Sequence, residues 1–184
     1  MSEQVHIQAT YVGDQPLLSI LEANIDLEQV SFSRTQMAVK ALFPVDLVVT
    51  ALTLHAFEKL VLDPLLAPIA EKFNWVSAVK RLIKPHQPFN VLVRIGDADF
   101  IEAPLDLDHF LLAEVWRILK GTLEILRNES LLDSISLIRI TSNSPGRPLV
   151  IAYRGARPSL HVLVSEGRTQ PISNPNQDTK SRPS

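Results

Sequence analysis

The amino-acid sequence predicts an α+β fold in which a small mixed or antiparallel sheet packs against helices. Three observations favour it: a period-two alternation near the start of the chain, apolar residues at helical spacing in its middle, and three strand-like segments in succession near its end. The elements that define the expected fold are a helical block at 36–84, a hairpin near 89–103, a long helix at 108–127 and a C-terminal meander at 135–165.

The first expected element is a strand at 5–11, where valine, isoleucine and alanine alternate with polar side chains. This alternation is typical of a strand with one covered face. Pro16 then suits the first turn of a short helix at 16–24, because the N–H that proline lacks has no partner at that position. A second short strand is expected at 29–33.

The helical block contains a predicted helix at 45–62 whose polar residues form only a narrow stripe. Asp46, Thr50 and Thr53 follow one another at spacings of four and three, and the positions around them are apolar. A helix with so little polar surface must be enclosed by its own domain or by a partner. Part of its apolar surface is therefore predicted to be an interaction surface, formed by Val45, Val48 and Leu52.

The remaining elements follow from capping and turn residues. A second amphipathic helix is expected to begin at Asp63 and to end before Pro85. The hairpin is expected to turn at Gly96, and the long helix to be capped by Asp106 or Asp108. Segments rich in proline, glycine and serine separate the three strands of the meander.

With 184 residues, 46% of them apolar, the chain can bury a core without metal or disulfide bonds. We expect one globular domain at 1–165, followed by a flexible polar tail at 166–184 that has too little apolar surface to offset the entropy cost of ordering. The N-terminus lacks the basic start and apolar stretch of a secretory signal, which predicts a cytoplasmic protein. No run is apolar enough for an integral membrane segment, whereas peripheral contact with a membrane stays an alternative.

Composition excludes several chemistries. The chain has no cysteine, which rules out disulfides, thiolate metal sites and a cysteine nucleophile. Its 6 glycines are too far apart for phosphate-binding loops, and its 5 histidines show no metal-ligand spacing. The formal charge of -2 gives no general attraction to nucleic acid. We therefore predict no catalytic residue, no metal or cofactor, and no nucleic-acid partner.

Two charged features remain as candidate sites. Carboxylates cluster at 97–108, but their spacing suits a turn and a helix N-terminus better than a divalent-ion loop. Basic side chains near the predicted strands form an anion site only if the sheet brings them to one face; they are Arg94, Arg139, Arg154 and His161. The other interpretation is that these arginines cover a solvated face with their aliphatic stems.

The sequence therefore favours an intracellular protein–protein interaction or assembly module that uses the apolar helix surface at 45–62. Its partner is expected to be another copy of the chain or a different protein. The alternative is a small-anion-binding or enzymatic domain that uses the strand arginines and the carboxylates of 97–108.

Overall fold

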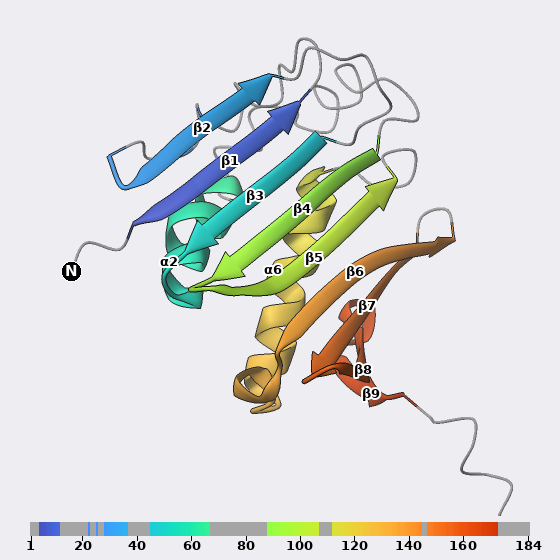
Figure 1. Cartoon of the computed structure of the whole chain (residues 1–184). Helices are drawn as coiled ribbons and strands as arrows, with labels where there is room; N and C mark the ends of the chain where they lie inside the picture. The colour runs from blue at the N-terminus through green and yellow to red at the C-terminus, as the bar shows by residue number, and fades with distance from the viewer. Residues whose placement is uncertain are drawn as a thin grey trace, which may run out of the picture.

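The computed structural model describes residues 4–11, 22, 25, 28–36, 45–66, 88–106, 112–144 and 147–172. Within these ranges, nine strands form one mixed sheet in the order β2-β1-β3-β4-β5-β6-β7-β8-β9 (Figure 1). The strands are β1 (Val5–Tyr11), β2 (Val30–Gln36), β3 (Val45–Ala51), β4 (Pro88–Ile95), β5 (Ala98–Asp106), β6 (Leu137–Ser144), β7 (Arg147–Arg154), β8 (Arg157–Leu163) and β9 (Arg168–Pro171).

Parallel and antiparallel pairs are mixed in the sheet. β1 is parallel to β2, β3 to β4 and β5 to β6, whereas the other neighbouring strands are antiparallel. A parallel pair needs a crossover connection, which is usually helical. The connections from β3 to β4 and from β5 to β6 accordingly carry the α-helices α2, α3 and α6.

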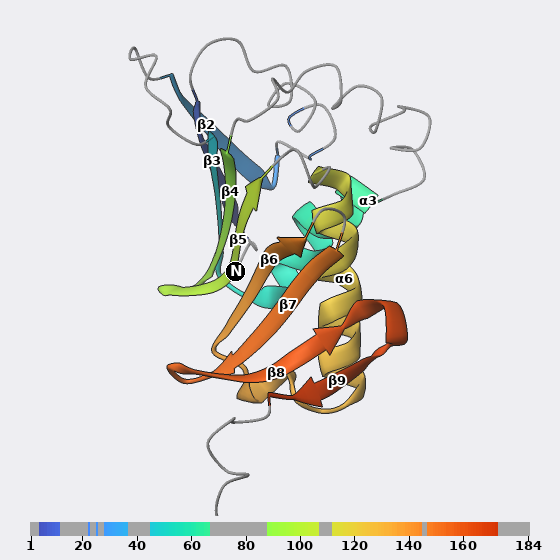
Figure 2. The ribbon, with the colours of Figure 1, turned by 90° about the vertical axis from the view of Figure 1, so that its right-hand side faces the viewer.

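The helices form a second layer. The first helical stretch, which we call the 54–66 segment, comprises α2 (Leu54–Phe57), the π-helical turn η1 (Glu58–Leu62) and α3 (Asp63–Leu66). The long helix is α6 (Leu112–Asn128), and the later short turns are η2 (Leu132–Ser134) and η3 (Val164–Glu166). In Figure 2, α3 and α6 lie on the same side of β2–β5, and β6–β9 turn away from β2–β5 and curve around α6, so the helices lie on the concave side of the sheet.

The core lies between these two layers. Apolar residues at alternate strand positions are buried against the helices, among them Val5, Ile7, Leu47, Val49, Val91, Val93, Ile101, Ile138, Ile140 and Val150. The buried stripe of α6 meets them with Trp116, Leu119, Leu123 and Leu126. The ring centroids of Phe57 in α2 and Trp116 in α6 are 6.5 Å apart, which joins the two helical stretches. The strand period of two and the helix period of 3.6 thus supply matching apolar surfaces.

The expected fold class was wrong, because the sheet is large and the helical block is small. The structure is mostly one nine-stranded mixed sheet, rather than a small sheet packed against helices at 36–84 and 108–127. Of the described residues in 36–84, only those of the 54–66 segment are helical. Residues 37–44 and 67–87, which include most of the second expected helix, lie outside the described part of the chain.

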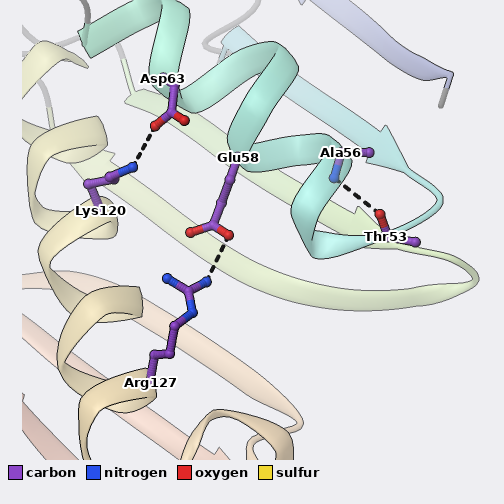
Figure 3. A network of polar contacts seen from close by, with 6 residues as sticks. All are labelled: Thr53, Ala56, Glu58, Asp63, Lys120 and Arg127. Atoms are coloured by element: carbon purple, nitrogen blue, oxygen red, sulfur yellow. Dashed lines mark hydrogen bonds and ion pairs between the residues drawn. The ribbon is translucent and has the colours of Figure 1, made fainter.

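The clearest difference is at 45–51, which was expected to be helical and forms β3 in the interior of the sheet, between β1 and β4. A short apolar run fits a buried strand as well as a buried helix, and its valines and threonine favour the strand because they are β-branched. The helix begins later, at an N-cap that the sequence interpretation placed inside it. The Thr53 Oγ1 accepts a hydrogen bond of 3.1 Å from the backbone N–H of Ala56 (Figure 3).

Other elements lie close to their expected positions. β1 occupies the first expected strand, β4 and β5 form the hairpin, β6 to β8 form the meander, and α6 covers most of 108–127. Gly96 in the hairpin turn has a φ of 61°, a conformation that glycine adopts without steric cost. No helix in the described part of the chain is long and apolar enough to cross a membrane.

The sheet also extends beyond 1–165. β9 lies inside the expected tail and pairs with β8 from Leu163↔Arg168 to Leu160↔Pro171. Backbone hydrogen bonds hold such an edge strand without apolar side chains, so the polar composition of 166–171 did not indicate it. Residues 173–184 lie outside the described residues, as does the expected helix at 16–24 apart from Glu22. The division into one domain and a tail stays a prediction.

Candidate functional site

The candidate site is the face of the sheet opposite the helices. We call it the open face: it consists of the strand positions that alternate with the buried ones, and no described helix lies on it (Figure 2). One row of paired residues, which we call the central row, crosses this face over all nine strands. It runs Ser33, Gln8, Val48, Leu92, Glu102, Arg139, Ile151, His161 and Gln170.

The centre of this row is apolar on both sides of one ion pair. Val48, Leu92 and Ile151 are each only half-buried, which places apolar surface on the open face. Between Leu92 and Ile151 lie Glu102 on β5 and Arg139 on β6. A sheet face that contacts only water normally carries polar side chains at these positions. These three side chains therefore add partly exposed apolar surface to the middle of the open face.

The Glu102–Arg139 pair is hydrogen-bonded and partly exposed. Arg139 donates from Nε to the Glu102 Oε2 at 2.9 Å and from Nη2 to the same oxygen. The side chains of Arg139 and Glu102 are 42% and 31% exposed. The guanidinium carbon also lies 5.8 Å from the centroid of the Tyr153 ring. The hydrogen bond with Glu102 is the main cause that raises the pKa of Arg139, so the guanidinium keeps its charge in this contact.

A hollow of about 410 Å³ lies beside this ion pair. It extends over β3, β4 and β5 and is lined by Leu47, Val48, Asn90, Val91, Leu92, Glu102, Ala103 and Pro104. Most of these residues are apolar, and Glu102 is the acidic side chain among them. The hollow therefore suits an apolar side chain better than a small charged molecule.

The structure pairs two features that the sequence interpretation treated separately. The carboxylates of 97–108 and the strand arginines bind one another: Arg94 Nε donates to the Asp99 Oδ1 at 2.7 Å, and Arg139 binds Glu102. These contacts depend on the registers of β4–β5 and β5–β6, which the sequence does not show. Each of these two arginines already has a carboxylate, which reduces its attraction for a further anion.

The other expected anion-site residues are spread over the sheet. His161 lies in the central row, but Ile151 stands between it and Arg139, so the two are two strands apart, roughly 10 Å. Arg154 lies at the end of β7, where it pairs in register with Arg157. The structure thus brings Arg139 and His161 to the same face without placing them around one ligand.

The expected interaction surface is also divided. Val48 lies in the central row of the open face, whereas Val45 starts β3. Leu52 follows β3 and is 62% exposed. Among the described residues it is the one large apolar side chain that is exposed. These residues were grouped on one helix face, and a strand does not give them that arrangement.

A second, charged cleft of about 400 Å³ lies between the 54–66 segment and α6. Glu58 accepts a hydrogen bond of 2.8 Å from the Arg127 Nη2, and Asp63 accepts one of 2.5 Å from the Lys120 Nζ (Figure 3). Sequence reasoning missed this cleft, because Glu58 and Asp63 are five residues apart and residues at that spacing do not share a face of an α-helix.

The π-helical turn explains how these charges meet. The backbone N–H of Asp63 donates to the carbonyl of Glu58, so residues five apart lie above one another in η1. Lys120 and Arg127 are seven residues apart, which is two turns of α6. The hydrogen bond with Asp63 is the main cause that raises the pKa of Lys120. Because Lys120 and Arg127 each have an acidic partner on the 54–66 segment, we assign these two pairs the role of docking that segment on α6.

Two further observations bear on function. In the described part of the chain, no group of three or more histidine, aspartate or glutamate side chains is arranged to hold a metal ion. Comparisons with protein-family models, with curated proteins and with solved structures gave no match.

Proposed function

We propose that this protein is an interaction module that binds another polypeptide through the open face of its sheet. The observation that carries the proposal is the apolar centre of that face at Val48, Leu92 and Ile151. All-parallel sheets usually have both faces covered, and this mixed sheet has three parallel pairs with described helices on one side only. A partner supplies the second covering layer.

The proposed binding surface, the open face of the sheet, differs from the helix surface that the sequence favoured. The segment 45–51 is a strand, so an apolar helix surface at 45–62 is not available, and Val48 contributes to a sheet face instead. The anion-binding alternative loses support because Arg94 and Arg139 are already paired with Asp99 and Glu102. An intracellular location stays part of the proposal.

Site-specific photo-crosslinking tests this function. A diazirine side chain of the size of leucine is placed at Leu92, on the open face, and in a matched variant at Glu124, on the exposed side of α6. After irradiation in the cells that make the protein, we expect position 92 to yield a discrete protein adduct, with the linked peptide identified by mass spectrometry. Equal adduct yields at the two positions, or none at Leu92, would overturn the proposal.

A further inference from the structure

The geometry points to a hydrolytic site for carboxylic esters at the β2 end of the open face, with Ser33 as nucleophile and His6 as general base. This inference does not depend on the proposed function, because it needs no partner polypeptide. It rests on two hydrogen bonds that join the His6 imidazole in β1 to two serines of β2. The Ser31 Oγ lies 2.8 Å from the His6 Nδ1, and the Ser33 Oγ lies 3.2 Å from the His6 Nε2.

The parallel pairing of β1 with β2 creates this cluster. His6 is in register with Ser31, and Ser33 follows two residues later on the same strand. Because side chains alternate along a strand, both serines point to the face that carries His6. In the sequence, His6 is 25 residues from Ser31 and 27 from Ser33, so no local pattern links them. His6 and Ser31 are exposed and Ser33 is half-buried, which leaves the cluster accessible to a substrate.

The hydrogen bonds assign a different role to each serine. A neutral imidazole has one N–H donor and one acceptor nitrogen. The hydroxyl of Ser31 has a single hydrogen, which it donates to the carbonyl oxygen of Val5 at 3.4 Å, so Ser31 accepts from the Nδ1–H of His6. The Nε2 is then the acceptor, and the Ser33 hydroxyl donates to it. Ser33 therefore contacts its base as an activated nucleophile does, and Ser31 is a positioning residue that orients the ring.

The reaction is acyl transfer in two steps. The Ser33 Oγ attacks the carbonyl carbon of the ester while its proton passes to the His6 Nε2; the bond to the alcohol then breaks, and the alcohol leaves with that proton. Water attacks the acyl-serine in the same way and gives a proton to Nε2, which returns it to the Ser33 Oγ as the carboxylic acid is released. Gln8 is in register with Ser33 one strand away, about 4.8 Å, so its amide N–H can stabilise the oxyanion of each tetrahedral intermediate.

The apolar centre of the open face indicates the class of acyl group. From Ser33, the central row passes Gln8 and reaches Val48 and Leu92, and Figure 1 shows β2, β1, β3 and β4 side by side. Val48 and Leu92 line the hollow of about 410 Å³. Val48 is two strands from Ser33, about 10 Å. An acyl chain attached at Ser33 therefore reaches the hollow only if it is apolar and of medium length, which makes a medium-chain ester the expected substrate.

Hydrolysis of p-nitrophenyl octanoate by the purified full chain tests the site. Ser33→Ala and His6→Gln should each lower kcat/KM at least about a hundredfold, because each removes one half of the nucleophile–base pair. His55→Gln and Ser159→Ala are matched controls and should leave kcat/KM unchanged: His55 is an exposed histidine on α2, and Ser159 is a strand serine whose hydroxyl donates to a backbone carbonyl. An equal loss in His55→Gln, or no loss in Ser33→Ala, would overturn the proposal. Circular dichroism and thermal melting check that each variant is folded.

Covalent labelling of the wild-type chain provides a measurement that no folding defect can affect. A fluorophosphonate reacts with activated serines, so mass spectrometry should find the adduct on Ser33 and not on Ser159. The same reagent should leave Ser33 unlabelled in His6→Gln. A wild-type chain without an adduct on Ser33 would refute the assignment of the nucleophile.

Two further variants test the positioning residue and the acyl group. Ser31→Ala should lower kcat with little change in KM, whereas Ser31→Thr keeps the hydroxyl and should retain most of the wild-type kcat; equal values of kcat in these two variants would contradict the role of Ser31. Leu92→Ser should raise KM for p-nitrophenyl octanoate and leave KM for p-nitrophenyl acetate unchanged, because only the longer chain reaches the hollow. The same change for both esters would refute the medium-chain assignment.

Discussion

Replacement of Thr122 by valine is expected to stabilise the protein. Thr122 lies in α6, is 0% exposed, and its Oγ1 has no hydrogen-bond partner among the described residues. An unpaired buried hydroxyl costs about 1 to 3 kcal/mol relative to an apolar group of the same shape. Valine has that shape, and its helix propensity is close to that of threonine. We expect Thr122→Val to raise the free energy of unfolding by about 1 to 2 kcal/mol, after allowing for imperfect packing.

The measurement is urea unfolding together with thermal melting. In a chain of 184 residues, the expected gain corresponds to a rise in Tm of about 3 to 6 °C. Thr122→Ser is the matched control, because it keeps the hydroxyl and removes the methyl group, and it should destabilise the protein by about 1 kcal/mol. If Thr122→Val were instead less stable than the wild type by about 1 kcal/mol or more, the hydroxyl would have to donate or accept a hydrogen bond in solution, and the reasoning would be refuted.

Two other predictions concern the edge of the sheet and one ion pair. A chain that ends at Gly167 loses β9 and the 2.9 Å hydrogen bond from the Thr169 N–H to Glu129, so its free energy of unfolding should fall by about 1 to 3 kcal/mol. A chain that ends at Ile172 keeps both and should melt at the same temperature as the full chain. Equal melting temperatures of the two truncated chains would contradict the role of β9. The raised pKa of Lys120 means that its contribution to stability is complete below its unfolded value of 10.5 and is lost as pH rises through the higher folded value. The difference in urea midpoint between the wild type and Lys120→Met should therefore shrink as pH rises above 10.5, and a difference that does not change with pH would contradict the Asp63 contact.

Local patterns were sufficient for several elements. β1 was indicated by strict alternation, because only a strand places every second residue on one face. The hairpin of β4 and β5 was indicated by alternating apolar residues around Gly96, and α6 by apolar residues at spacings of three and four. In each case the pattern has one period, and neighbouring residues in the sequence are enough to recognise it.

The patterns were insufficient where the period is ambiguous or where the backbone alone makes the contact. In β3, the apolar run around Leu47 and Val49 is compatible with either period, and only its position between β1 and β4 makes it a strand. β9 is polar and is held in the sheet by pairing with β8. The interpretation of 45–62 as an apolar helix surface assumed the helical period for 45–51. Because these residues form a strand, the expected interaction surface on that helix does not exist.

The sequence indicated which types of residue form the candidate site, but it did not indicate which of them are neighbours. Arg94, Arg139 and the acidic residues of 97–108 were recognisable as charged groups on strands and turns, and Val48 as part of an apolar run. Their partners were decided by sheet order and register, which place Arg139 beside Glu102 and Val48 beside Leu92. By itself the sequence determined local periods, turns and the chemistries that composition excludes, because these depend on residues close together along the chain. The tertiary structure alone decided which charges neutralise each other and which apolar side chains lie on the open face, because hydrogen bonding between distant strands sets those neighbours.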